Sequence, residues 1–166
     1  ALGNSIDLKG QSSVSFLSPA AVYRLFLPEI LPHLSRAIYL DADTVVDMDL
    51  AEMWGQDLRG FPLGAVPDLG VQRALYVTGR DAACDLWANG AMARWRELDI
   101  PLERYFNSGS LLMDLDGIRR DKLFAATLDF IERNPNLPCL DQDALNAVFR
   151  ERYAELPFRF NIMLSM

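Results

Sequence analysis

The sequence has little cysteine, little lysine and no long apolar run. Its two cysteines, Cys84 and Cys139, form neither a C-x-x-C pair nor a disulfide framework. No run of 18 apolar residues is present, so neither a transmembrane segment nor a signal peptide is predicted. The only lysines are Lys9 and Lys122, and the net charge of −7 excludes the basic surface of a nucleic-acid-binding protein. We therefore expect a reduced, cytoplasmic protein without a nucleic-acid partner.

The composition and the order of the expected elements indicate one α/β domain. Of 166 residues, 51% are hydrophobic and 23% charged, which is ordinary for a globular domain. Apolar and alternating segments predict strands at 14–17, 38–40, 63–68, 111–115 and 153–160. Helical spacing and start signals predict helices at 19–27, 29–34, 49–54, 80–96, 123–133 and 141–149. Residues 116–120 are expected to form a charged turn. Strands that alternate with helices favour an α/β fold.

Two aspartates follow the apolar run 38–40. This run, rich in β-branched and aromatic residues, predicts a buried strand that leads into Asp41 and Asp43. Because buried unpaired charges are costly, both carboxylates should emerge at the carboxyl edge of the sheet, where open α/β sheets bind ligands. Alternation along an extended chain would direct both to the same side, which suits a divalent cation with open positions for phosphate oxygens. The alternative is a pair of solvated carboxylates in a turn.

Further polar side chains stand at the edges of other predicted elements, where functional residues gather. They are Asp68, Asn107, Asp141, Gln142 and Asp143. Purely structural roles are available for three of them. Asp141 could be a helix N-cap, Asp143 a first-turn anion and Asn107 a turn residue before a glycine. None of these roles explains Gln142, an amide between two acids.

Three blocks occur in an order that resembles glycosyltransferase family 8, and within it the bacterial lipopolysaccharide glucosyl- and galactosyltransferases. The blocks are residues 36–46, residues 105–115, and residues 141–146 with Phe160-Asn161. The resemblance implies a GT-A fold, an incomplete Rossmann-like mixed sheet with flanking helices. It also implies a UDP-sugar donor, Mn²⁺ or Mg²⁺ as cofactor, and transfer of glucose or galactose to a glycan acceptor with retention of configuration.

The same resemblance assigns roles to individual residues. The metal pair would be Asp41 and Asp43. The substrate-binding residues would be Arg24, Asp41, Asn107, Ser108, Asp141 and Gln142. The catalytic candidates would be Gln142, Asp143 and Asp68.

Two blocks of the family have no counterpart in the sequence. The strand that carries much of the uridine pocket would precede Ala1, and a His-x-x-Gly-x-x-Lys-Pro-Trp block would follow Met166; His33, the only histidine, does not match it. We therefore expect residues 1–166 to be a partial catalytic domain. The acceptor implied is a lipid-linked oligosaccharide at the inner face of the plasma membrane. Any peripheral membrane association would come from segments not in this sequence.

The reaction that fits these residues leaves the nucleophile open. Gln142 is a poor nucleophile, so we favour attack from the leaving-group face, with the departing phosphate oxygen as base and Gln142 stabilising an oxocarbenium-like sugar. A covalent route through Asp143 or Asp68 is the alternative. Two other functions also stay open: a metal-dependent phosphohydrolase, whose Asp-x-Asp would be followed by Thr44, and a non-catalytic sugar-nucleotide-binding domain.

Overall fold

The fold is built on a mixed sheet, as predicted. The computed structural model describes residues 19–77 and 86–162, so the strand expected at 14–17 and Cys84 lie outside the described residues. The strands are β1 (Arg36–Leu40), β2 (Leu63–Pro67), β3 (Phe106–Asp114) and β4 (Tyr153–Glu155), in the order β1-β3-β2-β4. Strand β3 runs antiparallel to β1 and β2, whereas β2 and β4 are parallel.

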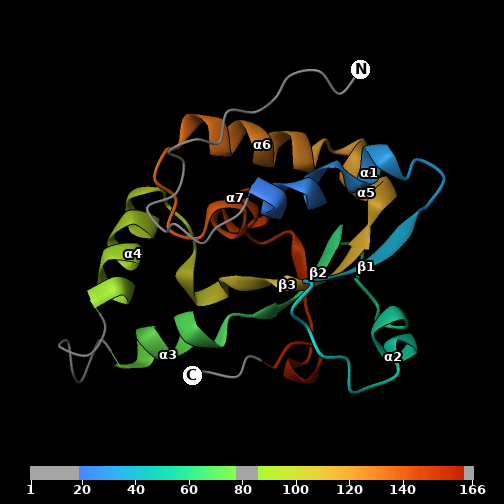
Figure 1. The fold of residues 1–166 in the computed structure, drawn as a ribbon, viewed down its shortest axis with the longest axis horizontal. Coiled ribbons are helices and arrows are strands. Elements are labelled where there is room, and N and C mark those ends of the chain that lie inside the picture. The colour runs from blue at the N-terminus through green and yellow to red at the C-terminus, as the bar shows by residue number, and fades with distance from the viewer. Residues whose placement is uncertain (1–18, 78–85, 163–166) are drawn as a thin grey trace.

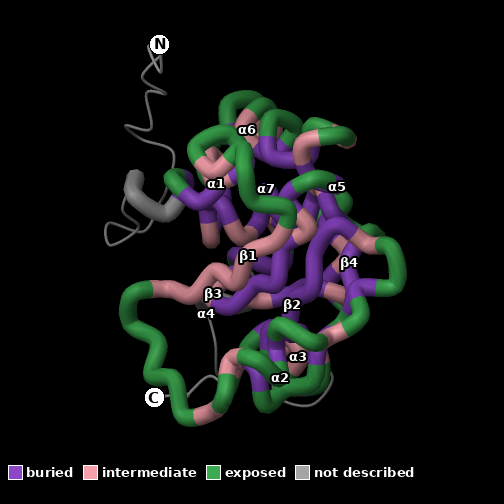
Figure 2. Tube along the Cα trace, turned by 90° about the vertical axis from the view of Figure 1, so that its right-hand side faces the viewer, coloured by how far each residue is buried: buried purple, intermediate pink, exposed green. Residues whose placement is uncertain are grey.

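Helices cover both faces of this sheet. They are α1 (Leu27–Ile30), α2 (Leu50–Trp54), α3 (Leu69–Val77), α4 (Leu86–Glu97), α5 (Leu115–Arg120), α6 (Leu123–Arg133) and α7 (Leu140–Phe149). A 3-10 helix at Pro19–Phe26 leads into α1. Helices α1, α5, α6 and α7 lie on one side of the sheet, and α2 and α3 on the other (Figures 1 and 2). Among the described residues, no helix is both long enough and apolar enough to cross a membrane.

Strand β3 supplies the core on both faces. Its alternation directs Leu111 and Met113 toward the cluster that includes α6 and α7, and Leu112 toward the cluster that includes α2. All three side chains are fully buried. A third cluster joins α4 to the segment before β3 and contains Met92, Trp95, Ile100, Leu102 and Tyr105. Figure 2 shows β2 and most of β3 as buried, whereas β1 is only partly buried.

Several predicted elements are confirmed, and others are wrong in their limits. Helix α6 spans the predicted 123–133, and Asp49 caps α2 by accepting a hydrogen bond from the amide of Ala51. Residues 116–120 are not a turn, because Asp114 caps α5 through the amide of Gly117. The strand expected at 153–160 is only β4, since Pro157 has no amide hydrogen to continue the ladder.

Two further expectations need correction. Strand β1 was expected to be buried, but all five residues are only partly buried, and in the described part of the chain β1 pairs with β3 alone. Helix α3 was not predicted, because residues 69–77 carry no clear start signal apart from the Asp68 before them. Both errors lie in segments whose structure depends on what packs beside them.

Candidate active site

An irregularity in β3 brings its polar residues to the end of β1. The β2 register steps from Ala65 opposite Leu111 to Val66 opposite Asn107, so residues 108–110 of β3 form a bulge against β2. On the other side, the amide of Asp41 donates to the carbonyl of Gly109 at 2.8 Å. Asn107 therefore lies inside a strand, so the alternative role of a turn residue does not apply to it.

Arg24 joins three of the predicted site residues. Its guanidinium donates to Asp41 Oδ1 at 2.9 Å and to the Ser108 carbonyl at 2.5 Å. Its Nε lies 3.1 Å from Asp141 Oδ2. The guanidinium also stacks over the ring of Tyr39, with 4.3 Å from Cζ to the ring centroid. Because a buried cation requires anionic partners, Arg24 holds the two carboxylates at one place.

The two aspartates of the Asp-x-Asp motif do not continue the strand. The amide of Thr44 donates to the carbonyl of Asp41 at 3.1 Å, so the chain turns here and the alternation argument does not apply. Asp43 is exposed, whereas Asp41 is partly buried and its Oδ1 accepts from Arg24 and from the Tyr39 hydroxyl. This position is a turn, as in the alternative interpretation, but Asp41 is paired rather than solvated.

The Asp41–Asp43 pair supplies part of a shell for a divalent cation. Carboxylate oxygens are the ligands that Mn²⁺ and Mg²⁺ take, and Asp41 Oδ2 faces Gly109, where a Cβ would approach it to 2.9 Å. The described residues contain no group of three or more His, Cys, Asp or Glu placed to hold a metal. Asp41 and Asp43 therefore offer the type of ligand that a divalent cation takes, and its other ligands would have to come from elsewhere, such as phosphate oxygens.

Next to Arg24, an amide network joins Ser108 to three more predicted residues. Gln142 Oε1 accepts from the Ser108 amide at 2.9 Å, while its Nε2 donates to Asp68 Oδ2 at 3.2 Å and to the Tyr105 hydroxyl at 3.3 Å. Asn107 Nδ2 donates to the same Asp68 oxygen at 3.1 Å. Asp68, Asn107, Ser108 and Gln142 thus meet at one point, although they come from the residue after β2, from β3 and from α7.

Asn107 and Asp68 are each held by a further contact. Asn107 Oδ1 accepts from the Gly109 amide and from Asn161 Nδ2, at 2.9 and 2.8 Å. Asp68 Oδ1 accepts from the amide of Val71 at 3.0 Å, in the first turn of α3. Both oxygens of Asp68 are therefore engaged.

Asp143 lies beneath this network and is fully buried. Its Oδ1 accepts from Trp95 Nε1 at 2.6 Å and from the Tyr105 hydroxyl at 2.5 Å. Its Oδ2 accepts from the amide of Cys139 at 2.8 Å. Cys139 is the N-cap residue of α7, so the alternative role of Asp141 as the cap of this helix does not apply.

Tyr105 and Trp95 were not among the predicted site residues, although Trp95 was expected to be buried. Their rings pack at 4.8 Å between centroids, and each donates to Asp143. The only sequence signal was that Tyr105 stands two residues before Asn107. The Cys139 thiol is not a candidate nucleophile. Burial raises its pKa, and the reactive form of a thiol is the thiolate.

Asp141 is buried and keeps one oxygen without a hydrogen bond. Burial raises its pKa to about 6, although the Arg24 charge lowers it. Its Oδ2 is close to Arg24 Nε, yet it accepts no hydrogen bond within the described part of the chain. A buried acceptor that protein groups leave unsatisfied is suited to a hydroxyl of a bound ligand.

This raised pKa predicts a pH dependence of stability. Because folding raises the Asp141 pKa from 3.8 to about 6, the folded state binds the proton more tightly. The stabilisation is complete below the unfolded pKa and is lost as the pH rises through 6, by about 3 kcal/mol. Urea unfolding measures this effect by comparison with Asp141→Asn, which cannot titrate at this position. The difference in unfolding free energy between the wild type and Asp141→Asn should change by about 3 kcal/mol between pH 4 and 7.

The control for this experiment is Asp129→Asn. Asp129 lies on α6 with half of its side chain exposed, where it pairs with Arg133. The difference in unfolding free energy between Asp129→Asn and the wild type should be almost constant over the same pH range, since exposed ion pairs contribute little. A constant difference for Asp141→Asn as well would contradict the raised pKa.

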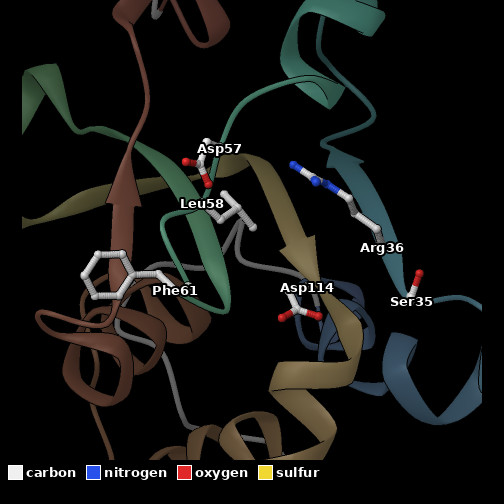
Figure 3. Close-up of a pocket in the computed structure, with 7 residues that line it drawn as sticks. Ser35, Arg36, Asp57, Leu58, Phe61 and Asp114 are labelled. Atoms are coloured by element: carbon white, nitrogen blue, oxygen red, sulfur yellow. The ribbon is translucent and has the colours of Figure 1, made fainter.

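A hollow of about 320 Å³ lies at the opposite end of β1 and β3 from this network. Its lining is Ser35, Arg36, Asp57, Leu58, Gly60, Phe61 and Asp114. In Figure 3, Arg36 points from β1 toward the loop that carries Asp57, and its Nη2 donates to the Gln56 carbonyl at 2.6 Å. None of the predicted site residues lines this hollow, so the candidate site is the polar network described above.

Comparison with known proteins gives one family. The model of glycosyl transferase family 8 matches residues 5–166. General stress protein A of Bacillus subtilis is 28% identical over 162 residues, which cover 92% of this chain and 50% of that protein. Glycosyltransferase GlyB of Streptococcus pneumoniae is 29% identical over 150 residues, which cover 90% of this chain and 30% of that protein. The chain thus spans half or less of the length of these relatives.

Solved structures show the same similarity. Galactosyltransferase LgtC, in complex with donor and acceptor sugar analogs, superposes with a TM-score of 0.71 at 26% identity, over 92% of this chain and 50% of that one. The bifunctional glycosyltransferase WbbM superposes with a TM-score of 0.70 at 24% identity, over 87% of this chain and 25% of that one.

Proposed function

Because the chain belongs to glycosyltransferase family 8 and has the GT-A fold, we propose that it carries the sugar-transfer site of a retaining UDP-hexose glycosyltransferase. The hexose would be glucose or galactose, and the acceptor a lipopolysaccharide or another lipid-linked or free glycan. The observation that carries the proposal is the convergence of Arg24, Asp41 and Asp141 beside the network of Gln142 with Ser108 and Asp68. The donor and acceptor sugar analogs bound to LgtC support it.

In this proposal Asp41 and Asp43 hold Mn²⁺ or Mg²⁺ together with the donor diphosphate. The ion would neutralise the charge that develops on the departing UDP. Arg24 holds the Asp41 carboxylate in place, because its guanidinium pairs with Asp41 Oδ1 and packs on Tyr39. Gly109 leaves room for the other Asp41 oxygen, since a Cβ at this position would lie 2.9 Å from it.

The sugar of the donor would lie against Asp141 and the amide network. Asp141 offers the buried oxygen that lacks a hydrogen bond, and a sugar hydroxyl is a suitable donor to it. Asn107 and Ser108 would line the same space, since both contact residues of the network. The Gln-to-Glu variant of LgtC, described as an active-site mutant, supports a glutamine in such a site.

The hydrogen bonds of the two acids favour same-face attack over a covalent route. A nucleophilic carboxylate needs a free oxygen near the anomeric carbon. Both oxygens of Asp68 and both of Asp143 already accept hydrogen bonds, and Asp143 is fully buried. We therefore assign Asp68 and Asp143 positioning roles. Gln142 would stabilise the oxocarbenium-like sugar by its dipole, while the leaving phosphate oxygen takes the proton of the acceptor.

The two other functions considered from the sequence are less well supported. A phosphohydrolase reading assigns a role to Asp41 and to Thr44, but it leaves the contacts of Gln142 with Ser108 and Asp68 without a purpose. A non-catalytic sugar-nucleotide-binding domain would use the same contacts without turnover. An activity assay separates this possibility from a transferase.

The test is UDP release from UDP-glucose and UDP-galactose by the full-length protein, with Mn²⁺ and with EDTA. We expect release that depends on the metal, and a loss of about 10- to 100-fold in apparent Mn²⁺ affinity for Asp41→Asn and for Gly109→Ala, which crowds Asp41 Oδ2. Asp47→Asn, an exposed acid in the same loop, is the matched control and should behave as the wild type. Binding of UDP without turnover would favour the non-catalytic domain, and turnover of p-nitrophenyl phosphate the phosphohydrolase.

A further inference from the structure

The hydroxyl of Tyr105 connects a buried carboxylate to the amide of Gln142. Tyr105 directly precedes β3, and its side chain is fully buried against the ring of Trp95. Its hydroxyl lies 2.5 Å from Asp143 Oδ1 and 3.3 Å from Gln142 Nε2. The position of this hydroxyl between the two side chains determines which group can donate to which.

The hydroxyl has one proton, which it donates in a hydrogen bond to Asp143. An ionised carboxylate can only accept hydrogen bonds, so the Tyr105 proton points toward Asp143 and the lone pairs of the Tyr105 oxygen face Gln142. Burial, and then the Asp143 charge, raise the Tyr105 pKa well above its ordinary value, so the hydroxyl keeps this proton. Toward Gln142, Tyr105 is therefore an acceptor only.

This polarity allows one orientation of the Gln142 amide. An amide side chain has a donor end and an acceptor end of almost the same shape, and the groups around it determine which way it points. Tyr105 and Asp68 both require the NH₂ end on their side. The Ser108 amide can only donate, so it requires the carbonyl end on the other side. The opposite orientation would place NH₂ against N–H and the carbonyl against two acceptors.

We propose that Tyr105 is a positioning residue that sets the orientation of the Gln142 amide, because the hydrogen bond that Tyr105 donates to Asp143 fixes the direction of its hydroxyl. The inference rests on the proposed transferase function of the same site. Within that function, it explains why Asp143 is buried one residue from Gln142: Asp143 fixes the direction of the Tyr105 hydroxyl, and the hydroxyl fixes the amide. The residue that acts on the sugar would still be Gln142.

The test compares Tyr105→Phe with Trp95→Phe in the full-length enzyme. Each removes one hydrogen-bond donor from the same Asp143 oxygen, but the Gln142 side chain bonds to Tyr105, Ser108 and Asp68 and not to Trp95. We expect Tyr105→Phe to lower kcat about tenfold and to change the donor KM less than about twofold. The loss in kcat should be smaller than the loss on removing the whole Gln142 side chain. Trp95→Phe should keep kcat within about twofold at temperatures where it stays folded.

A double-mutant cycle shows whether Tyr105 acts through Gln142. In a Gln142→Ala background, Tyr105→Phe should have no further effect on kcat, because the amide that it orients is absent. The proposal would be overturned if Tyr105→Phe and Trp95→Phe lowered kcat equally. It would also be overturned if Tyr105→Phe lowered kcat by the same factor in the wild-type and the Gln142→Ala backgrounds. A wild-type enzyme without transfer activity would instead refute the proposed function.

A second measurement needs no variant and no activity. In the folded wild type, the side-chain NH₂ protons of Gln142 should exchange more slowly with D₂O than those of a free glutamine, because two acceptors hold them in a partly buried network. Exchange as fast as in an unstructured peptide would show that the amide is not held, even if Tyr105→Phe failed to fold.

Discussion

Replacing Gln142 with alanine in the full-length protein is expected to lower kcat about 10²-fold and to change the donor KM little. Gln142 is held by Ser108 on one side and by Asp68 and Tyr105 on the other, so its dipole is set before the substrate binds. An electrostatic group that is already oriented stabilises charge in the transition state more than in the ground state. The measurement is steady-state UDP release with the donor varied at saturating metal.

Two further variants test this prediction. Gln56→Ala is the matched control: its amide bonds only to the carbonyl of Glu52, next to α2, and kcat should not change. Gln142→Glu should not restore activity, because a carboxylate would replace the NH₂ group that lies 3.2 Å from the Asp68 carboxylate. A covalent glycosyl-enzyme trapped on Asp68 or Asp143 with a slow fluorinated donor would contradict same-face attack.

The second large effect concerns stability. Asp143→Ala is expected to lower the free energy of unfolding by about 3–5 kcal/mol. The substitution removes the acceptor shared by three donors, namely Trp95 Nε1 and the Tyr105 hydroxyl, whose side chains are fully buried, and the partly buried amide of Cys139. The Asp143 carboxylate has a raised pKa because of burial, and these three donors lower it in part, so much of its charge is stabilised by them. Urea unfolding near pH 7, followed by circular dichroism, measures the effect.

Asp129→Ala is the control for charge removal alone. Asp129 is exposed on α6 and pairs only with Arg133 four residues later, a contact worth a few tenths of a kcal/mol. The loss of unfolding free energy for Asp143→Asn should lie between those of Asp129→Ala and Asp143→Ala. Its amide oxygen can still accept from Trp95 and Tyr105, but its NH₂ group faces the amide of Cys139. A loss below about 1 kcal/mol for Asp143→Ala would show that water or a rearrangement satisfies the three donors.

Helical geometry places the two acids of α7 on different sides of the helix. Residues two apart on a helix point about 200° away from each other, so Asp141 and Asp143 cannot face the same site from α7. Asp141 turns toward Arg24, and Asp143 turns toward Trp95 and Tyr105. Sequence order suggested a cluster of two acids around Gln142, whereas the helix separates the acids and leaves Gln142 between them.

The fold could be predicted as far as local signals reach. The N-cap Asp49, the amphipathic pattern of 123–133 and the apolar runs at 38–40 and 63–67 are contained in a few neighbouring residues, and all four elements form. The bulge at 108–110 forms against β2, a partner distant in sequence. The turn after Leu40 and the 3-10 helix after Pro157 are closed by local hydrogen bonds, from Thr44 to Asp41 and from Phe160 to Pro157, which the apolar pattern does not indicate. The strand ends were the least accurate part, because apolar patterns do not mark where a local turn or a bulge against another strand ends the ladder.

The spacing of three motif blocks within the sequence by itself determined the family, because such spacing is a property of the covalent chain. The site was decided only by tertiary structure, since its contacts join residues far apart in sequence: Gln142 reaches Ser108 across 34 positions and Asp68 across 74. The burial of Asp143 and the orientation of the Gln142 amide were decided in the same way. A carboxylate or an amide has no preferred partner until folding removes water and leaves only the protein groups around it to satisfy its hydrogen bonds.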